Sequence, residues 1–389
     1  MPPTVVGGSG GARGGAGGGG DVSEALVTTA GSSGGRGGGA AAVAASLTAK
    51  EEDPCCDAST ASASASAYRY TATVPPRLVV RPAARGVWRV LPVSTFGAGA
   101  VTKVTGLAAH VATGEVYAAD FSKMAFHVFS RALDLVTSFP FEVADEGDEP
   151  AGTMARPLKV AVDCTGARVF HAVVWACSRV TGELQASALY TYACDDGRLV
   201  HRMRGPGGAE VLRIGVHPTS GDVYVVTNPA PGEPRMFHVM VLSQGLLNLK
   251  ARWPTGAPYG RSKGVGVAVD LESGNVAIAD QEGGRVMVYT DAGVQVAAWE
   301  AGEPITSTLT LPDGYVTIYY DTGRVQVRHL ATGAVAAEHR PSAALPALCN
   351  TQTAAFNPHT GDIVYALDAP VGVRALAAVT IADPPPRLV

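Results

Sequence analysis

The feature that most constrains the fold is a repeated unit of short apolar segments joined by glycine turns. Its clearest copy lies in residues 264–300, where one apolar run is followed by a turn through Gly274 and a second apolar run that starts at Val276. Two further short runs, at residues 285–289 and 294–299, complete the unit. Because short apolar runs bounded by glycine turns are typical of strands, the unit is predicted to be a four-stranded antiparallel sheet.

The same unit recurs along the chain at intervals that can be measured from the first residue of each second strand. These intervals are 53, 54, 53, 40 and 47 residues. A repeat of about 40 to 50 residues is typical of a β-propeller, in which each repeat forms one blade. The sequence therefore predicts an all-β, six-bladed propeller with four-stranded antiparallel blades. The six second-strand starts are Val116, Val169, Val223, Val276, Val316 and Ile363.

The turn before the second strand has a repeated composition. In four repeats a His, Asp or Asn stands four residues before a glycine, at His110, His217, Asp270 and Asn357. Polar side chains can bond to the turn backbone, and glycine accepts the positive φ that closes a hairpin. We therefore interpret these histidines as turn residues rather than as metal ligands. The turn of the second repeat is one residue tighter, and the fifth, at residues 311–314, departs further from the pattern.

Closure of the ring is predicted from the two ends of the repeat region. After the sixth second strand there is room for a third strand in residues 371–382, but prolines at 384–386 prevent a fourth. Upstream of the first repeat, residues 86–91 resemble the outer strands that carry Trp253 and Trp299. We therefore expect this N-terminal strand to complete the sixth blade and to remove an exposed sheet edge.

The N-terminal part of the chain differs in composition from the rest. Residues 1–67 are rich in Gly, Ala and Ser and have almost no large apolar side chains, so burial cannot offset their ordering entropy. We predict a disordered tail over residues 1–67, a linker over 68–85 and the propeller over 86–389. The tail lacks the apolar core of a signal peptide and is a weak match to an organellar transit peptide.

Charge and cysteine content argue against several classes of function. A net charge of −4 and a pI near 6.1 give no general basic field that attracts nucleic acid. The acidic run at residues 142–149 is predicted to be a solvated loop rather than a calcium site.

No Cys-x-x-Cys pair occurs, so no zinc knuckle or RING finger is expected. Without a secretion signal or a glycosylation sequon, we expect free thiols and a cytoplasmic location, with organellar targeting left open. The cysteines are Cys55, Cys56, Cys164, Cys177, Cys194 and Cys349.

The first repeat resembles the NHL-repeat pattern, in which a Pro-Gly-x-Ala-Val-Asp strand is followed by Gly-Asn-x-Tyr-Val-Ala-Asp and then by an Arg-Ile-x-Val-Phe strand. The similar segments are GLAAH at 106–110, GEVYAAD at 114–120 and FHVF at 126–129, and the fourth repeat resembles the pattern again over residues 266–289. The resemblance implies a platform for protein or RNA, often found beside a RING finger in ubiquitin ligases. The Asn-His-Leu tripeptide is absent, and the second repeat carries an insertion at residues 175–183. A role in substrate recognition for a ligase would therefore need a separate RING protein.

The channel mouth is where propeller enzymes usually place metal ligands or acid–base groups. Counting four residues back from each turn gives one mouth residue per repeat, and none is a carboxylate or a histidine. Lactonase-like propellers hold a divalent metal at this level with Glu, Asn and Asp, whereas two cations here would repel such an ion. We therefore predict no catalytic residue, no metal and no cofactor, and keep a propeller hydrolase or lyase as an alternative. The mouth residues are Gly106, Lys159, Arg213, Gly266, Thr306 and Thr353.

Two cations in adjacent repeats, Lys159 and Arg213, give the predicted mouth its chemistry. They are either ordinary solvated cations balanced by acids such as Glu233, Asp280 and Glu282, or part of an anion-binding patch. The favoured function is a noncatalytic, monomeric interaction scaffold that binds a protein partner, through an acidic or phosphorylated peptide, and no membrane. RNA binding through the same face is the alternative. The further basic residues assigned to this face are Arg156, Arg235, Arg261, Lys263 and Arg285.

Overall fold

The structure of the protein is a computed structural model, and it places part of the chain well enough to describe. Within that part the chain is all-β apart from one short 3-10 turn at Pro206–Gly208, and no helix in it is long and apolar enough to cross a bilayer. The predicted tail and linker lie outside the described residues. The described residues are 94–97, 99–141, 152–165, 168–181, 184–244, 248–259, 264–311, 313–320, 322–340, 353–357, 360–368 and 374–380.

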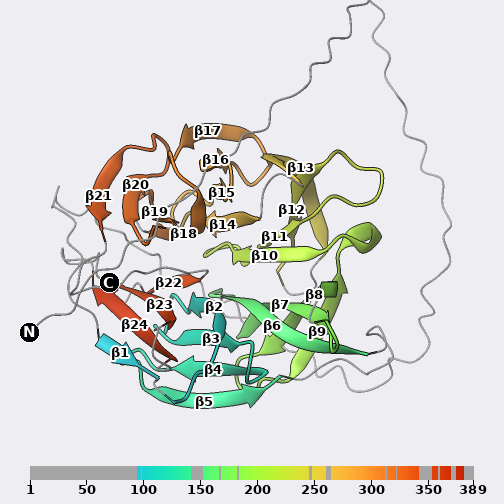
Figure 1. The fold of residues 1–389 in the computed structure, drawn as a ribbon, viewed down its shortest axis with the longest axis vertical. Helices are drawn as coiled ribbons and strands as arrows, with labels where there is room; N and C mark the ends of the chain where they lie inside the picture. The colour runs from blue at the N-terminus through green and yellow to red at the C-terminus, as the bar shows by residue number, and fades with distance from the viewer. Residues whose placement is uncertain are drawn as a thin grey trace, which may run out of the picture. The chain divides into compact units, whose positions relative to one another are not determined.

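Five four-stranded antiparallel sheets are each built from four consecutive strands (Figure 1). The first comprises β2 (Val104–Ala109), β3 (Val116–Asp120), β4 (Ala125–Phe129) and β5 (Leu135–Pro140). The second comprises β6 (Thr153–Val162), β7 (Val169–Ser178), β8 (Leu184–Ala193) and β9 (Leu199–Arg204). The third comprises β10 (Val211–Val216), β11 (Val223–Thr227), β12 (Met236–Leu242) and β13 (Leu249–Pro258). The fourth comprises β14 (Val265–Val269), β15 (Val276–Asp280), β16 (Arg285–Tyr289) and β17 (Gln295–Glu300). The fifth comprises β18 (Ile305–Leu311), β19 (Tyr315–Tyr320), β20 (Val325–His329) and β21 (Val335–His339).

The sixth sheet is composite, because it joins strands from both ends of the described chain. Its order is β1-β24-β23-β22, and β1 (Ser94–Phe96) pairs antiparallel with β24 (Arg374–Thr380), with Thr95 opposite Ala377. An N-terminal strand therefore completes the last sheet, as predicted. The described part of that strand is Ser94–Phe96, while the predicted strand, residues 86–91, lies outside the described residues. The other two strands are β22 (Ala354–Asn357) and β23 (Asp362–Asp368).

The sheets surround a common axis as the blades of a β-propeller (Figure 1). Each innermost strand contacts the innermost strands of its two neighbours, in the cyclic order β2, β6, β10, β14, β18, β22. Apart from the Thr and Ser residues of β18 and the cations Lys159 and Arg213, these strands are mostly small or apolar, as expected where six backbones crowd around one axis. The predicted fold class, an all-β propeller of antiparallel blades closed by an N-terminal strand, is confirmed. Five blades are continuous in sequence, and the composite sheet closes the ring.

The hydrophobic core lies between neighbouring blades. Between the first and second blades, Phe126 packs on Phe170 with ring centroids 4.9 Å apart, and Phe170 stacks on Tyr192 at 5.2 Å. Second strands such as β3 and β15 are completely buried, whereas the outer strand β5 is mostly exposed. The blades therefore become more solvent-exposed outwards, as the alternating sequence of the outer strands predicts.

An aromatic side chain near the end of the outer strand meets a glycine of the next blade at three blade boundaries. A Cβ atom added to each glycine would lie 2.4 to 2.6 Å from the aromatic ring system, which is too close for any other residue. These contacts fix the distance between the outer parts of neighbouring blades. The pairs are Phe139 with Gly197, Trp253 with Gly293 and Trp299 with Gly333.

The insertion noted in the second repeat is part of the sheet. Strands β6, β7 and β8 have ten residues each, and the inserted residues extend the β7–β8 hairpin. Trp175, in β7, donates from Nε1 to the carbonyl of Val211 in the next blade at 3.4 Å. The insertion thus lengthens one blade and contacts its neighbour.

Candidate functional site

Five of the six predicted mouth residues line one small cavity at one end of the axial channel. The cavity has a volume of about 80 Å³ and is lined by residues from all six innermost strands. The sixth, Gly106, packs against the backbone of Lys159: a Cβ there would lie 2.7 Å from the Lys159 Cα. The structure therefore brings five of the six predicted mouth residues together around one cavity on the axis. The five lining residues are Lys159, Arg213, Gly266, Thr306 and Thr353, joined by Gln281, Ser307 and Thr308.

A β-bulge stands directly before each of the two mouth cations. The pairing of β6 with β7 shifts between Pro157 and Lys159, and the pairing of β10 with β11 shifts between Val211 and Arg213. A bulge re-aims the side chain that follows it and is common next to binding sites. Lys159 Nζ donates to the Thr105 carbonyl at 2.6 Å, and Arg213 Nη1 donates to its neighbour's carbonyl, that of Leu212, at 2.9 Å.

The two cations are held in an electrostatically unfavourable environment. Lys159 is 7% exposed, and burial, followed by the charge of Arg213, holds its pKa well below the usual value. Burial also lowers the pKa of Arg213, to about 10. None of the described residues lining the cavity is an Asp or a Glu. Since an anion between the two cations would relieve their repulsion, the mouth is suited to bind one.

Three of the other predicted basic residues, Arg156, Arg235 and Arg285, are described and do not line the mouth cavity. Arg156 Nη1 donates to the Phe121 carbonyl at 2.7 Å and its guanidinium lies 5.1 Å from the Phe121 ring centroid. Arg285 Nη2 donates to the Gly256 carbonyl at 2.9 Å. Arg235 is exposed on the loop before β12. The side chains of Arg156 and Arg285 thus have local backbone partners, whereas Arg261 and Lys263 lie outside the described residues.

The acids that were expected to balance these cations have other partners. Glu233 forms a bidentate ion pair with Arg252, with Arg252 Nη2 donating to Oε2 at 2.7 Å. Asp280 accepts from the backbone N–H of Gly283 at 3.0 Å. Neither acid forms a described ion pair with a predicted mouth cation, so the interpretation as a balanced surface gains no support at these two positions.

Beyond the mouth most of the side chains that line the axial channel are apolar. A second cavity of about 170 Å³ is lined by the following residues of the same innermost strands, among them Ala161, Val216 and Val269. The two cavities share lining residues such as Leu107 and Val160. The level of Lys159 and Arg213 is therefore where an anionic group entering from the mouth finds its charge partners.

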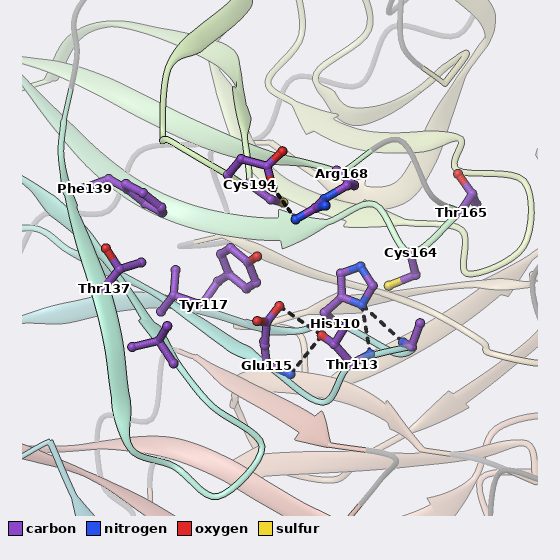
Figure 2. Close-up of a pocket in the computed structure, with 14 residues that line it drawn as sticks. His110, Thr113, Glu115, Tyr117, Thr137, Phe139, Cys164, Thr165, Arg168 and Cys194 are labelled. Atoms are coloured by element: carbon purple, nitrogen blue, oxygen red, sulfur yellow. Dashed lines mark hydrogen bonds and ion pairs between the residues drawn. The ribbon is translucent and has the colours of Figure 1, made fainter. Parts of the chain in front are cut away.

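A larger cavity, of about 570 Å³, lies between the first and second blades (Figure 2). Tyr117 and Phe139 form an apolar floor, while Glu115, His110 and Arg168 lie around it. This cavity depends on how two blades pack, and no repeat position in the sequence marks it. One sequence difference at this blade boundary is in the outer strand, which carries Phe139 in the first blade where the third and fourth blades carry Trp253 and Trp299.

Two of the three cysteines of the second blade line this larger cavity. Cys164 and Cys194 are lining residues, whereas Cys177 is not. All three are free thiols. Burial raises the pKa of Cys164 to about 12 and that of Cys194 to about 11, so both thiols are protonated and weakly nucleophilic near neutral pH.

The first blade contains an Asp, a His and a Ser in sequence-distant positions that sequence spacing could not connect. His127 Nδ1 lies 2.8 Å from Ser138 Oγ, and its Nε2 lies 3.7 Å from a carboxylate oxygen of Asp120. Asp120 is fully buried and accepts backbone N–H bonds from residues 102, 103, 122 and 123. Ser138 is exposed and lines none of the three cavities described above. The cluster therefore joins turns and strands of the blade, and its hydroxyl adjoins none of these three cavities.

The turn histidines have the role that their spacing predicts. His110 Nδ1 accepts from the backbone N–H groups of Ala112 and Thr113 at 3.2 Å each, and His217 Nδ1 accepts from Thr219 in the same way. His359 lies outside the described residues. No group of three or more His, Cys, Asp or Glu side chains within the described residues is placed to hold a metal ion.

The fold and the site define the class of protein as a β-propeller with a cationic channel mouth. No protein-family model matches the chain, and no curated protein matches it. The likeness of the first and fourth blades to the NHL repeat thus remains a resemblance of sequence pattern.

Proposed function

We propose that this propeller is a noncatalytic interaction scaffold that captures an anionic side chain of a protein partner at the channel mouth. The observation that carries the proposal is the juxtaposition of Lys159 and Arg213 in one cavity whose described lining contains no acid. Thr306 and Ser307 add hydroxyl groups to the same wall. Cations and hydroxyls together are the groups that recognise carboxylate and phosphate in proteins.

The size of the mouth cavity supports a side chain rather than a free ligand. A volume of about 80 Å³ holds only a few waters, since each water occupies about 30 Å³ of liquid. Pockets for drug-sized ligands measure about 300 to 1,000 Å³. A single carboxylate or phosphate group fits, and the rest of the partner then lies over the rim of the mouth. The ligand class is therefore an acidic or phosphorylated peptide.

A protein partner is favoured over RNA by the placement of the charges. Binding along a phosphate backbone needs several solvent-accessible cations, because each neutralised phosphate contributes by releasing counterions. Here Lys159 is recessed, and the side chains of Arg156 and Arg285 bind backbone carbonyls. The resemblance to NHL repeats supports a platform function of either kind, and recruitment to a ubiquitin ligase would require a separate RING protein.

The test measures binding of fluorescent peptide pools to the full chain by polarisation. We expect a pool with fixed phosphoserine or glutamate to bind, and binding to fall at least tenfold in the Lys159→Glu, Arg213→Glu variant. The control is Arg198→Glu, Arg340→Glu, which changes the net charge equally at exposed positions. Because a buried glutamate can disturb folding, Lys159→Met is measured in parallel, with circular dichroism on every variant.

Four outcomes would overturn the proposal. Equal binding of the phosphorylated and unmodified pools would remove the anionic ligand, and undiminished binding by the folded mouth variants would remove the site. Tight binding of single-stranded RNA, with log affinity falling by about 0.7 per neutralised phosphate per decade of salt, would favour the RNA alternative. A divalent ion retained at one equivalent by the full chain purified without chelator would favour the hydrolase or lyase alternative.

A further inference from the structure

The first and third blades carry the same set of residues at the boundary with the next blade, with two informative differences. Glu115 and Asp222 each follow the turn glycine and precede the second strand, and Tyr117 corresponds to Tyr224. The fifth residue of the outer strand is Phe139 in β5 and the larger Trp253 in β13. The smaller ring of Phe139 lines the cavity of about 570 Å³ between the first and second blades.

The second difference is an ion pair that only the third blade contains. The second residue of the outer strand is Lys250 in β13, and its Nζ lies 2.6 Å from Oδ2 of Asp222. The corresponding residue in β5 is Val136, so Glu115 faces an apolar side chain where Asp222 faces an ammonium group. Within the described residues no ion pair involves Glu115, and its Oε2 accepts only from Thr113 Oγ1, at 3.0 Å.

The other charges around the cavity are already compensated. Arg168 forms an ion pair with Asp195 at the rim. Burial raises the pKa of the Tyr117 phenol and of the Cys194 thiol, the negative charge of Glu115 adds to both shifts, and the positive charge of Arg168 opposes them. The cavity therefore combines one carboxylate lacking a cationic partner with a floor of two aromatic rings (Figure 2).

We propose that this cavity binds a small aromatic amine. The ammonium group lies at Glu115, in the position that Lys250 Nζ occupies at Asp222, and the ring packs on Tyr117 and Phe139. Aromatic faces also attract a neighbouring ammonium group. The volume falls in the range of about 300 to 1,000 Å³ that suits a small molecule, and it exceeds what a single lysine side chain fills.

This site is independent of the anionic-peptide site at the channel mouth. The two cavities share no lining residue: one lies between two blades and the other on the axis. Failure of either proposal leaves the other unaffected.

The test is isothermal titration of the full chain with tryptamine and with indole-3-propionate, which has the same ring system and the opposite charge. We expect tryptamine to bind at least tenfold more tightly than indole-3-propionate. Glu115→Gln should weaken tryptamine binding at least tenfold. Val136→Lys should abolish binding, because it supplies the ammonium group from the protein as Lys250 does in the third blade.

Val296→Lys is the matched control, since Val296 is the second residue of the outer strand β17 and is 54% exposed, against 58% for Val136. The control should bind tryptamine as the parent chain does. The proposal is overturned if tryptamine does not bind at millimolar concentration, if both ligands bind equally, or if Val136→Lys leaves binding unchanged. Because Val136 is exposed, its variant stays informative even if Glu115→Gln disturbs folding.

Discussion

Replacing Gly293 by alanine tests whether the contact between an outer aromatic and a glycine holds neighbouring blades together. Gly293 has a φ of +80°, and a Cβ atom there would lie 2.4 Å from Cγ of Trp253. Gly302 has a similar φ of +86°, but a Cβ atom there would meet no atom within 4 Å. Both substitutions therefore impose a comparable backbone strain, and only Gly293→Ala adds a clash.

The magnitude of each loss follows from these two terms. An L-residue in the left-handed region costs about 1 to 2 kcal/mol. Overpacking a well-filled contact costs about 1 to 3 kcal/mol more, and Trp253, which is 7% exposed, cannot move outwards without losing burial. We therefore expect Gly302→Ala to lower the free energy of unfolding by about 1 to 2 kcal/mol and Gly293→Ala by about 2 to 5 kcal/mol.

The assay is equilibrium denaturation of the full chain followed by circular dichroism, with a double-mutant cycle. In a Trp253→Ala background the clash is absent, so Gly293→Ala should cost no more than Gly302→Ala does in the parent chain. Equal losses at the two glycines in the parent chain would refute the reasoning, because the outer aromatic would then contribute nothing to the spacing of the blades.

Three further predictions concern charged groups. Burial and the charge of Arg213 hold the pKa of Lys159 low, and an anion bound at the mouth should raise that pKa. The affinity for a phosphopeptide pool should therefore fall as pH rises through the lowered pKa of Lys159, and titrations in several buffers should show proton uptake on binding. The Lys159→Met variant should lose this pH dependence. The pKa of Glu233 is lowered from 4.5 to about 2, first by its hydrogen bond with Arg252, so its contribution to stability is complete above about 4.5 and is lost as pH falls towards 2. Glu233→Gln should therefore be less stable than the parent chain at pH 7 and equally stable near pH 2 in denaturation curves. Asp120→Asn should lower the free energy of unfolding by about 2 to 5 kcal/mol, because it weakens several hydrogen bonds to a fully buried carboxylate. Ser138→Ala, at the exposed end of the Asp120, His127 and Ser138 cluster, should change the free energy of unfolding by less than about 1 kcal/mol.

The blades were predictable because their signals are local and repeated. Second strands begin at the predicted residue in four blades, for example at Val116 and Val276, and one residue earlier in the fifth and sixth. Turn spacing and strand period follow from backbone geometry, which every copy must satisfy. The same period placed Lys159 and Arg213 at one level of the axis, and the structure brings both into one cavity.

Features that depend on packing between distant residues could not be predicted in this way. The closing strand β1 has three residues, too few for a pattern, and its pairing with β24 is decided by ring closure. The cavity beside Tyr117 lies between two blades, and no repeat position in the sequence marks its lining residues. The contact of His127 with Ser138 joins residues eleven positions apart on separate strands, a spacing without a characteristic motif.

The composite sixth sheet also sets the order in which the ring can be completed during synthesis. Each of the five continuous blades has all four strands as soon as its own segment has left the ribosome, so its pairing is local and fast. The strand β1 is made before any of them, yet its partner β24 is the last of the described strands to be made. Until β1 pairs with it, β24 is the open edge of a three-stranded sheet, and three residues, Ser94–Phe96, cover that edge.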